Sequence, residues 1–310
     1  MKKVFVARKL LRSNEKRMSE IWDAKLNFED KVYSQRELIE LSKDCDGILC
    51  SMVDKFDAET INKLSDKVKI ISNIAVGFGN IDIKATMNKN IIVTNTPDVL
   101  TDATVEIAIL ILLGAARRAT EGRKWVDKKN WTWSANFLMG KQLTDSRLGI
   151  LGMGRIGQAL AERTKSFGMK IHYHNRKKLP SNLEKGAIYH ESLKSLILVS
   201  DFFSINCPTT EETKKIINEE TLSYFLNGAV IINSARGDMI DDEAMINALK
   251  SGKVFALGLD VYNGEPDIHP QYLKLDNVFI LPHLGSATEK TRFAMADLAI
   301  SNIEEYFNTG

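Results

Sequence analysis

Short runs of apolar residues alternate with longer stretches of helical composition along almost the whole chain. A first series lies at residues 4–8, 46–51, 69–73 and 90–95, and a second at 147–154, 170–174, 201–207, 229–234, 254–261 and 277–282. Strands that are apolar on both faces and alternate with helices form parallel sheets with helices on both sides. We therefore expect an α/β fold, and 310 residues are enough for two domains.

The charge of the chain is nearly balanced. Forty-two basic and 40 acidic residues leave a net charge of +2. Such a balance produces no overall field that favours a polyanion or an anionic surface. We therefore expect neither nucleic acid nor a membrane as a partner.

The three cysteines, Cys45, Cys50 and Cys207, have neither CxxC nor Cys/His metal spacing. This usage is typical of a reducing compartment, so we expect a cytoplasmic location without disulfides, and no metal site. Charged residues interrupt the N-terminal segment MKKVFVARKLL, which argues against a secretory signal. The longest apolar run, residues 107–116, is about half of the roughly 20 residues that span a bilayer and predicts a buried helix.

A glycine-rich loop follows the strand expected at residues 147–151. Gly152, Gly154 and Gly157 form G-x-G-x-x-G directly before a helical segment. In this context the first glycine permits a tight turn, the second lets a pyrophosphate approach, and the third allows the helix to pack on the strand. The alternative is a glycine-rich turn without a ligand. The motif predicts a dinucleotide site at Gly152, Met153, Gly154, Arg155, Ile156 and Gly157.

The residues after the next strand indicate which dinucleotide is bound. About 20 residues after the glycines, where NAD-binding folds hold a carboxylate for the ribose 2′-hydroxyl, the chain has Asn175, Arg176, Lys177 and Lys178. Neutral Asn175 does not repel a 2′-phosphate, and Arg176 offers it a planar fork of donors. The sequence therefore favours NADP(H), with NAD(H) possible. A solvated run of charges is the alternative.

Five further segments carry a resemblance to a known family. They are VGFGNID (76–82), TDATVEIAI (101–109), NSARGDMIDDEAMINAL (233–249), ALGLDVYNGEP (256–266) and LPHLGSAT (281–288). Together they resemble the D-isomer-specific 2-hydroxyacid dehydrogenase family. The HNRKK turn and the segment NWTWSANFLMG (130–140) are most similar to its glyoxylate and hydroxypyruvate reductases and their 2-ketogluconate-reducing relatives.

The resemblance implies two domains with one inserted into the other. A flavodoxin-like substrate-binding domain would comprise residues 1–98 plus 286–310, and a Rossmann domain residues 99–285. The final segment would form a returning helix with Ser286 near its start. The active site is then expected in a cleft, at the carboxyl ends of strands.

Three residues would carry the chemistry. The resemblance implies that Arg236 binds the substrate carboxylate and polarises the C2 carbonyl, that His283 is the acid/base, and that Glu265 pairs with His283. A neighbouring carboxylate favours the imidazolium that donates a proton to the carbonyl. Taken singly, these residues also fit a surface arginine, a turn glutamate and a core histidine.

The remaining contacts also follow from the resemblance. Asp260 would contact the nicotinamide carboxamide, and Cys207, Pro208 and Thr209 would line the adenine side, with simple loop packing as the alternative. Further cofactor contacts are expected from Thr104, Ser234, Ala235 and Gly285.

For the substrate, the backbone amides of Val76 and Gly77 are expected to bind the carboxylate, and Ser51 and Met52 to touch its far side. Trp133 would reach the site of a neighbouring subunit. The usual proline after this tryptophan is replaced by Ser134-Ala135, so an anchor in a dimer interface is an equal alternative.

A helix expected over 102–127 is too apolar to face water, and in the family it builds a twofold interface, so we expect a homodimer. The predicted activity is NAD(P)H-dependent reduction of a small 2-oxo acid to the D-2-hydroxy acid. Two alternatives stay open. One is an enzyme like phosphoglycerate dehydrogenase, although Asn175 suits NAD less well, and the other is a nucleotide-sensing scaffold without catalysis.

Overall fold

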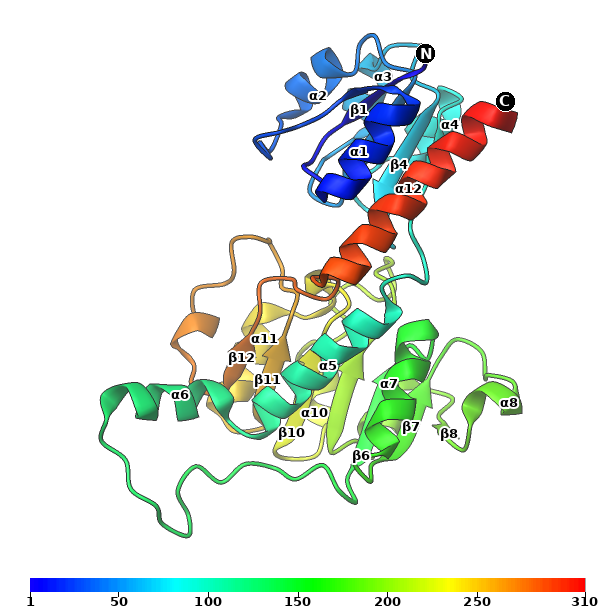
Figure 1. Cartoon of the computed structure of the whole chain (residues 1–310). Helices are drawn as coiled ribbons and strands as arrows, with labels where there is room; N and C mark the ends of the chain where they lie inside the picture. Colours follow the sequence, from blue (N-terminus) through cyan, green and yellow to red (C-terminus); the bar gives the residue numbers. More distant parts are fainter. Residues whose placement is uncertain (310) are drawn as a thin grey trace. The chain divides into compact units, whose positions relative to one another are not determined.

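The computed structural model describes residues 1–309 and divides into two compact units (Figure 1). The first unit contains Met1–Leu100 and the chain from Ser286 onward, and the second contains Thr101–Gly285. Each unit is built on one parallel sheet.

The first unit has a five-stranded sheet in the order β2-β1-β3-β4-β5. Helices cover both of its faces. Val4 and Val6 of β1 pack with Met18 and Ala299 on one face, whereas Phe5 packs with residues such as Leu38 on the other. The strands are β1 (Lys3–Val6), β2 (Asp23–Lys25), β3 (Gly47–Ser51), β4 (Ile70–Ile74) and β5 (Ile92–Thr94); α1 (Arg12–Ile21) and α12 (Glu289–Thr309) cover the first face, and α2 (Gln35–Leu41), α3 (Ala58–Lys63) and α4 (Ile83–Asn88) the second.

The second unit has a seven-stranded sheet in the order β12-β11-β10-β9-β6-β7-β8. Its strands are β6 (Arg147–Leu151), β7 (Lys170–His174), β8 (Ile188–Tyr189), β9 (Phe202–Ile205), β10 (Ala229–Asn233), β11 (Val254–Leu259) and β12 (Val278–Ile280). Counted from β6, the order is 3-2-1-4-5-6 with one added strand, which is the Rossmann order. The five-stranded sheet has the flavodoxin-like order 2-1-3-4-5. The predicted α/β fold class is confirmed.

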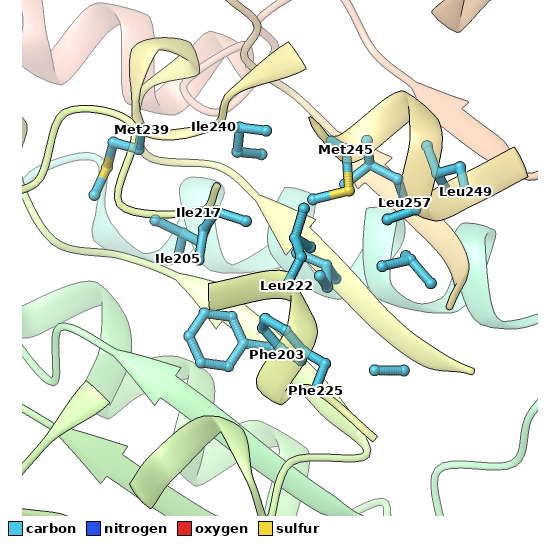
Figure 2. Packing of buried hydrophobic residues seen from close by; sticks show 14 of the residues in the cluster. Phe203, Ile205, Ile217, Leu222, Phe225, Met239, Ile240, Met245, Leu249 and Leu257 are labelled. Atoms are coloured by element: carbon cyan, nitrogen blue, oxygen red, sulfur yellow. The ribbon is translucent and has the colours of Figure 1, made fainter. Parts of the chain in front are cut away.

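Alternating side chains bury both faces of the seven-stranded sheet. Val230 and Ile232 of β10 pack beneath α5 (Thr101–Ala116) and α7 (Arg155–Lys165), which Figure 1 shows on the same face. Ile231 points to the opposite core, drawn in Figure 2, where the rings of Phe203 and Phe225 meet edge to face at 5.1 Å. The helices of this face are α9 (Leu193–Ile197), α10 (Glu219–Tyr224) and α11 (Asp242–Lys250).

The prediction of one continuous helix over residues 102–127 is wrong, because this segment forms two helices. α5 ends at Ala116, and α6 runs over Ala119–Lys128 after Arg118, which takes a left-handed backbone with φ 56°. The apolar face stops at two consecutive arginines, and the Arg118 guanidinium binds Glu121 through Nε and Nη2 at 2.9 Å. α5 is buried as the 107–116 run predicts, whereas α6 has no buried residue.

Two short edge strands, β2 and β8, were not predicted. β2 has three residues, of which the outer two are exposed, and β8 has two. Neither has the apolar run that marks a central strand. Within residues 1–309, no helix combines the length and apolarity that crossing a membrane requires.

Candidate functional site

The glycine-rich loop lies between β6 and α7. Gly152 has φ 95°, and a Cβ there would lie 2.5 Å from the Cys207 amide nitrogen. A Cβ on Gly157 would lie 2.3 Å from the Gly152 carbonyl oxygen. Protein packing therefore requires both glycines. In contrast, a Cβ on Gly154 would meet nothing within 4 Å, and no side chain caps the first turn of α7. Open space before an uncapped helix end fits the close approach of a pyrophosphate.

Buried polar atoms without partners occur at the carboxyl ends of two adjacent strands. The Asn206 Oδ1 and Ser234 Oγ atoms are both buried and have no hydrogen-bond partner among residues 1–309. They follow β9 and β10, which pair in register up to Ile205 and Asn233. Buried polar atoms nearly always have a hydrogen-bond partner, so the unused hydrogen-bonding capacity of these two atoms fits a polar ligand at this edge. Ser234 was predicted as a cofactor residue, whereas Asn206 was missed, although a polar residue that ends an apolar strand was its signal.

Asn175 follows β7 and holds the glycine-rich loop directly. Its Oδ1 accepts a hydrogen bond from the Met153 amide at 2.6 Å. Arg176 and Lys177 are exposed beside it and make no ion pair with residues 1–309. The turn therefore offers two unpaired cations next to the loop.

His283 and Glu265 form a close pair. His283 Nδ1 lies 2.6 Å from Glu265 Oε2, and the two side chains keep 26% and 29% of their surface exposed. The other carboxylate oxygen accepts a hydrogen bond from the Tyr262 amide at 3.0 Å. Burial alone would raise the pKa of Glu265, but the hydrogen bond and charge of His283, with the charge of Arg236, hold that pKa below its ordinary value. Glu265 is therefore an ionised partner at neutral pH.

Arg236 is held close to this pair. A Cβ on Gly237 would lie 2.0 Å from the Tyr262 carbonyl carbon, so the Arg236–Gly237 turn packs directly on the segment that leads to Glu265. Asn233 fixes the turn, because its Nδ2 donates to the Arg236 carbonyl oxygen at 2.7 Å. The Arg236 side chain is half-buried, and its Nη1 donates to the Ala235 carbonyl oxygen at 2.6 Å. The structure thus brings an arginine, a carboxylate and a histidine into one region of the second unit.

A buried carboxylate organises the segment that carries His283. Asp260 is 1% exposed and accepts hydrogen bonds from the amides of Leu284 at 2.7 Å and Gly285 at 2.8 Å. Its carbonyl oxygen accepts from the His283 amide at 2.9 Å, and Thr104 Oγ1 donates to the Gly285 carbonyl oxygen at 3.0 Å. Burial raises the pKa of Asp260, against the opposing effect of the two amides. These contacts hold His283 at φ 56°, an uncommon backbone conformation for a side chain of this size.

The other predicted residues are distributed over both units, and Cys207 among them lies against Gly152 of the glycine-rich loop. Thr209 Oγ1 donates to Asp238 Oδ1 at 2.7 Å, and burial raises the pKa of Cys207, which precedes Pro208, to about 11. Trp133 is 81% exposed on the segment after α6. In the first unit, Ser51 ends β3 and Met52 follows it, and Val76 and Gly77 follow β4. Residues 1–309 contain no group of three His, Cys, Asp or Glu side chains that could hold a metal ion.

A Rossmann sheet with a glycine-rich loop after its first strand defines the class of dinucleotide-binding α/β proteins. Residues 109–285 match the family model described as "D-isomer specific 2-hydroxyacid dehydrogenase, NAD binding domain". The chain belongs to the D-isomer specific 2-hydroxyacid dehydrogenase family, as its sequence motifs suggested.

Known relatives match the chain over nearly its full length. It is 39% identical over 309 residues to a glycerate dehydrogenase of Hyphomicrobium methylovorum, covering 99% of this chain and 96% of the relative. A solved putative D-isomer specific 2-hydroxyacid dehydrogenase from Polaromonas has a TM-score of 0.94 at 42% identity, covering 100% of this chain and 97% of that one. An NADPH-dependent glyoxylate/hydroxypyruvate reductase from Sinorhizobium meliloti, solved with NADP and malonate, has a TM-score of 0.88 at 31% identity, with coverages of 100% and 94%.

Proposed function

We propose that the protein reduces a small 2-oxo acid of the glyoxylate or hydroxypyruvate type to the D-2-hydroxy acid, with NADPH preferred over NADH. The observation that carries this proposal is the 2.6 Å contact between His283 and Glu265 in a region that also contains Arg236. A cation that binds a carboxylate and an acid that delivers a proton are the groups that reduction of a 2-oxo acid needs. The names of the relatives from Hyphomicrobium and Sinorhizobium support this substrate class.

The chain's own residues have distinct roles in the proposed reaction. The reduced nicotinamide supplies a hydride to C2 when it is bound. Arg236 binds the substrate carboxylate and stabilises the negative charge that grows on the C2 oxygen, because guanidinium stays charged at any working pH. His283 donates the proton to this oxygen from its Nε2, since its Nδ1 faces Glu265. Glu265 holds the imidazole ring in orientation through its contact with Nδ1.

The cofactor is proposed to bind along the carboxyl edge of the Rossmann sheet. The loop Gly152–Gly157 would take the pyrophosphate, and Arg176 and Lys177 the 2′-phosphate of NADPH. The exposed, unpaired state of these two cations and the NADP bound to the Sinorhizobium reductase support this preference. Further cofactor contacts are proposed from the other predicted positions, Thr104, Asn175, Cys207, Pro208, Thr209, Ser234, Ala235, Asp260 and Gly285.

The first unit is proposed to be the substrate-binding domain, with Val76, Gly77, Ser51 and Met52 as its contacts. A homodimer is also proposed. α6 has no buried residue within the chain, and Trp131 and Trp133 on the following segment are 58% and 81% exposed. Exposed tryptophans of this size are typical of interfaces, and Trp133 is proposed to act at the partner's site. A cytoplasmic location completes the proposal.

The deciding experiment follows oxidation of NADPH and of NADH at 340 nm with glyoxylate, hydroxypyruvate and 2-ketogluconate. We expect turnover with at least one of these acids and formation of the D-enantiomer wherever the product is chiral. Binding of NADPH without turnover of any 2-oxo acid would instead favour the nucleotide-sensing scaffold. Oxidation of 3-phosphoglycerate with NAD, at a higher kcat/KM than any of the reductions, would favour the phosphoglycerate dehydrogenase alternative.

A further inference from the structure

Three consecutive carbonyl groups after β4 are each bound by another part of the first unit. The Ala75 carbonyl oxygen accepts hydrogen bonds from the Thr96 amide at 2.9 Å and from its hydroxyl at 3.2 Å. The Val76 carbonyl oxygen accepts from Asn95 Nδ2 at 2.7 Å. The Gly77 carbonyl oxygen accepts from Asn73 Nδ2 at 2.9 Å.

These hydrogen bonds fix the directions of the amide hydrogens. In a planar trans peptide the N–H points opposite to the C=O, and the peptide bonds of this segment are trans. Because the carbonyls of Ala75 and Val76 both face residues 95–96, the N–H groups of Val76 and Gly77 both point away from that segment. Neither N–H has an acceptor within residues 1–309. Both N–H groups can therefore donate to an anion on the side away from residues 95–96.

The Gly77 carbonyl is bound by a network of two asparagines, one buried and one half-buried. Asn73 is fully buried, and its Nδ2 also donates to Asn80 Oδ1 at 3.1 Å. Asn80 Nδ2 donates in turn to the carbonyl oxygens of Ser51 and Asp54, both at 3.0 Å. Through this network, the segment that follows β3 and the segment that follows β4 are tied together. Deleting one amide would leave carbonyls unpaired and free the peptide planes to rotate.

We propose that Asn95 and Asn73 are positioning residues, which do not touch the substrate but hold the peptide groups of residues 75–78 so that their amides receive its carboxylate. The proposal rests on the proposed function, in which the Val76 and Gly77 amides bind that carboxylate. It identifies the side chains that determine affinity for the carboxylate. Asn95, which directly follows the edge strand β5, fixes the peptide plane that carries the Gly77 amide. Asn73 of β4 fixes the next plane through the Gly77 carbonyl and so restrains Gly77 from its other side.

The test is the variant Asn95→Ala, since Asn95 lies at the sheet edge and is only half-buried. We expect the KM for glyoxylate to rise by about tenfold, which corresponds to about 1.4 kcal/mol, while kcat stays within about twofold. The Kd for NADPH, measured by fluorescence without substrate, should not change. Oxalate, an unreactive dicarboxylate, should bind the enzyme–NADPH complex with a Kd weakened by the same factor in calorimetry. Asn95→Gln retains an amide donor and should recover part of the affinity.

A matched control is Asn27→Ala. Asn27 is also a buried asparagine of the first unit, and its Nδ2 donates to the carbonyl oxygens of Ala7 and Lys31, both at 2.8 Å. This variant should lower Tm without raising the KM for glyoxylate. If Asn95→Ala leaves both KM and the oxalate Kd at their wild-type values, or if Asn27→Ala raises KM equally, the positioning role is overturned.

A second variant, Asn73→Ser, tests the other amide, and circular dichroism checks its fold. If this variant is unfolded, Asn95→Ala decides the question alone.

Failure of the proposed reaction and failure of the positioning role give different results. A wild type that binds oxalate but turns over no 2-oxo acid overturns the proposed reaction only, and weaker oxalate binding by Asn95→Ala would then still support the positioning role. A wild type that turns over glyoxylate while Asn95→Ala is unaffected overturns the positioning role only.

Discussion

The imidazole of His283 and the carboxylate of Glu265 meet at 2.6 Å, with Nδ1 of the ring facing Oε2. The strand β12 lies between them in the sequence, and backbone hydrogen bonds hold each of the two residues in place. The Tyr262 amide binds the second carboxylate oxygen, and Asp260 binds the backbone on either side of His283. This pair is the basis of the first prediction.

Glu265→Gln should lower kcat for glyoxylate reduction by about 100-fold with little change in KM, because the amide keeps the shape but removes the negative charge that faces His283 Nδ1. Steady-state kinetics at pH 7 measures this effect. The chain offers a matched control in the second unit, where His269 Nε2 lies 3.1 Å from Glu243 Oε1. Glu243→Gln should leave kcat unchanged. Equal rates for the two variants would remove Glu265 from the reaction.

Arg236→Ala should reduce kcat/KM by about 1,000-fold through both a higher KM and a lower kcat, since the guanidinium is proposed to bind both substrate and transition state. Arg236→Lys should recover only a small part, because an ammonium cannot bond two oxygens in one plane. Arg123→Ala, which removes an exposed guanidinium paired with Asp127, serves as the control. Unchanged kinetics of Arg236→Ala would exclude the residue from the site.

Arg176→Asp should reverse the preference for NADPH, because a carboxylate repels a 2′-phosphate and can bond a ribose 2′-hydroxyl. The ratio of kcat/KM for the two cofactors measures the change, and we expect it to fall by about 100-fold. Lys43→Asp changes the net charge equally on an exposed part of the first unit and should leave the ratio as it is. A wild type that uses NADH better than NADPH would contradict the assignment of this turn.

Two substitutions in the glycine-rich loop should have opposite consequences. Gly157→Ala brings a Cβ within 2.3 Å of the Gly152 carbonyl oxygen and should lower Tm. Gly154→Ala meets no protein atom within 4 Å and should leave Tm unchanged, yet raise the Kd for NADPH by about tenfold or more. Thermal unfolding and cofactor fluorescence test the two variants together. If Gly154→Ala bound NADPH normally, the pyrophosphate would not approach this residue.

The stability of the second unit should fall in mild acid because of a histidine pair. His172 Nδ1 lies 2.9 Å from His190 Nε2. Burial lowers the pKa of both histidines below the ordinary 6.5. The charge of His190, with Arg147 and Lys170, lowers the pKa of His172 further, and Asp201 opposes this effect. The charge of His174 lowers the pKa of His190 further. The unfolded chain therefore takes up protons first, and the free energy of unfolding should decrease as the pH falls below about 6.5.

The measurement is urea unfolding at pH 7.5 and pH 5.5. His190→Gln should lose less stability between these two pH values than the wild type, since it removes one of the two titrating rings of the pair. His269→Gln, which removes a histidine outside this pair, should keep the wild-type difference. The same pH dependence in His190→Gln and the wild type would show that the pair does not control it.

The sequence was sufficient for the features that depend on local chemistry. The glycine spacing after residues 147–151 predicted a strand, a turn and a helix, and the structure has β6 and α7 there. The α/β class followed from the apolar runs, and the Rossmann and flavodoxin-like architectures followed from the family resemblance, without the edge strands β2 and β8. The break at Arg118 was missed because the helical pattern continues across it, and only the left-handed backbone of one residue interrupts it.

The supporting side chains could not be predicted, because their roles depend on partners distant in sequence. Asn95 and Asn73 lie near the ends of predicted strands, without any motif that marks them. Nothing near Asn95 in the sequence shows that it reaches the Val76 carbonyl. Asp260 could be matched to a family residue, but its hydrogen bonds with the amides of Leu284 and Gly285 can be seen only in the folded structure. A polar residue after an apolar strand was the only sequence signal for Asn206, and that its Oδ1 atom is buried without a partner in residues 1–309 is known only from the structure.

The hydrogen bond from Asn95 to the Val76 carbonyl oxygen has a consequence for how this protein can evolve. It connects the outermost strand of the five-stranded sheet to the peptide planes of residues 75–77. With the positioning role proposed for Asn95, mutations on that edge strand would change substrate affinity while Arg236 and His283 remain unchanged. Natural variants that differ in substrate affinity but share the same reaction would be expected to differ there.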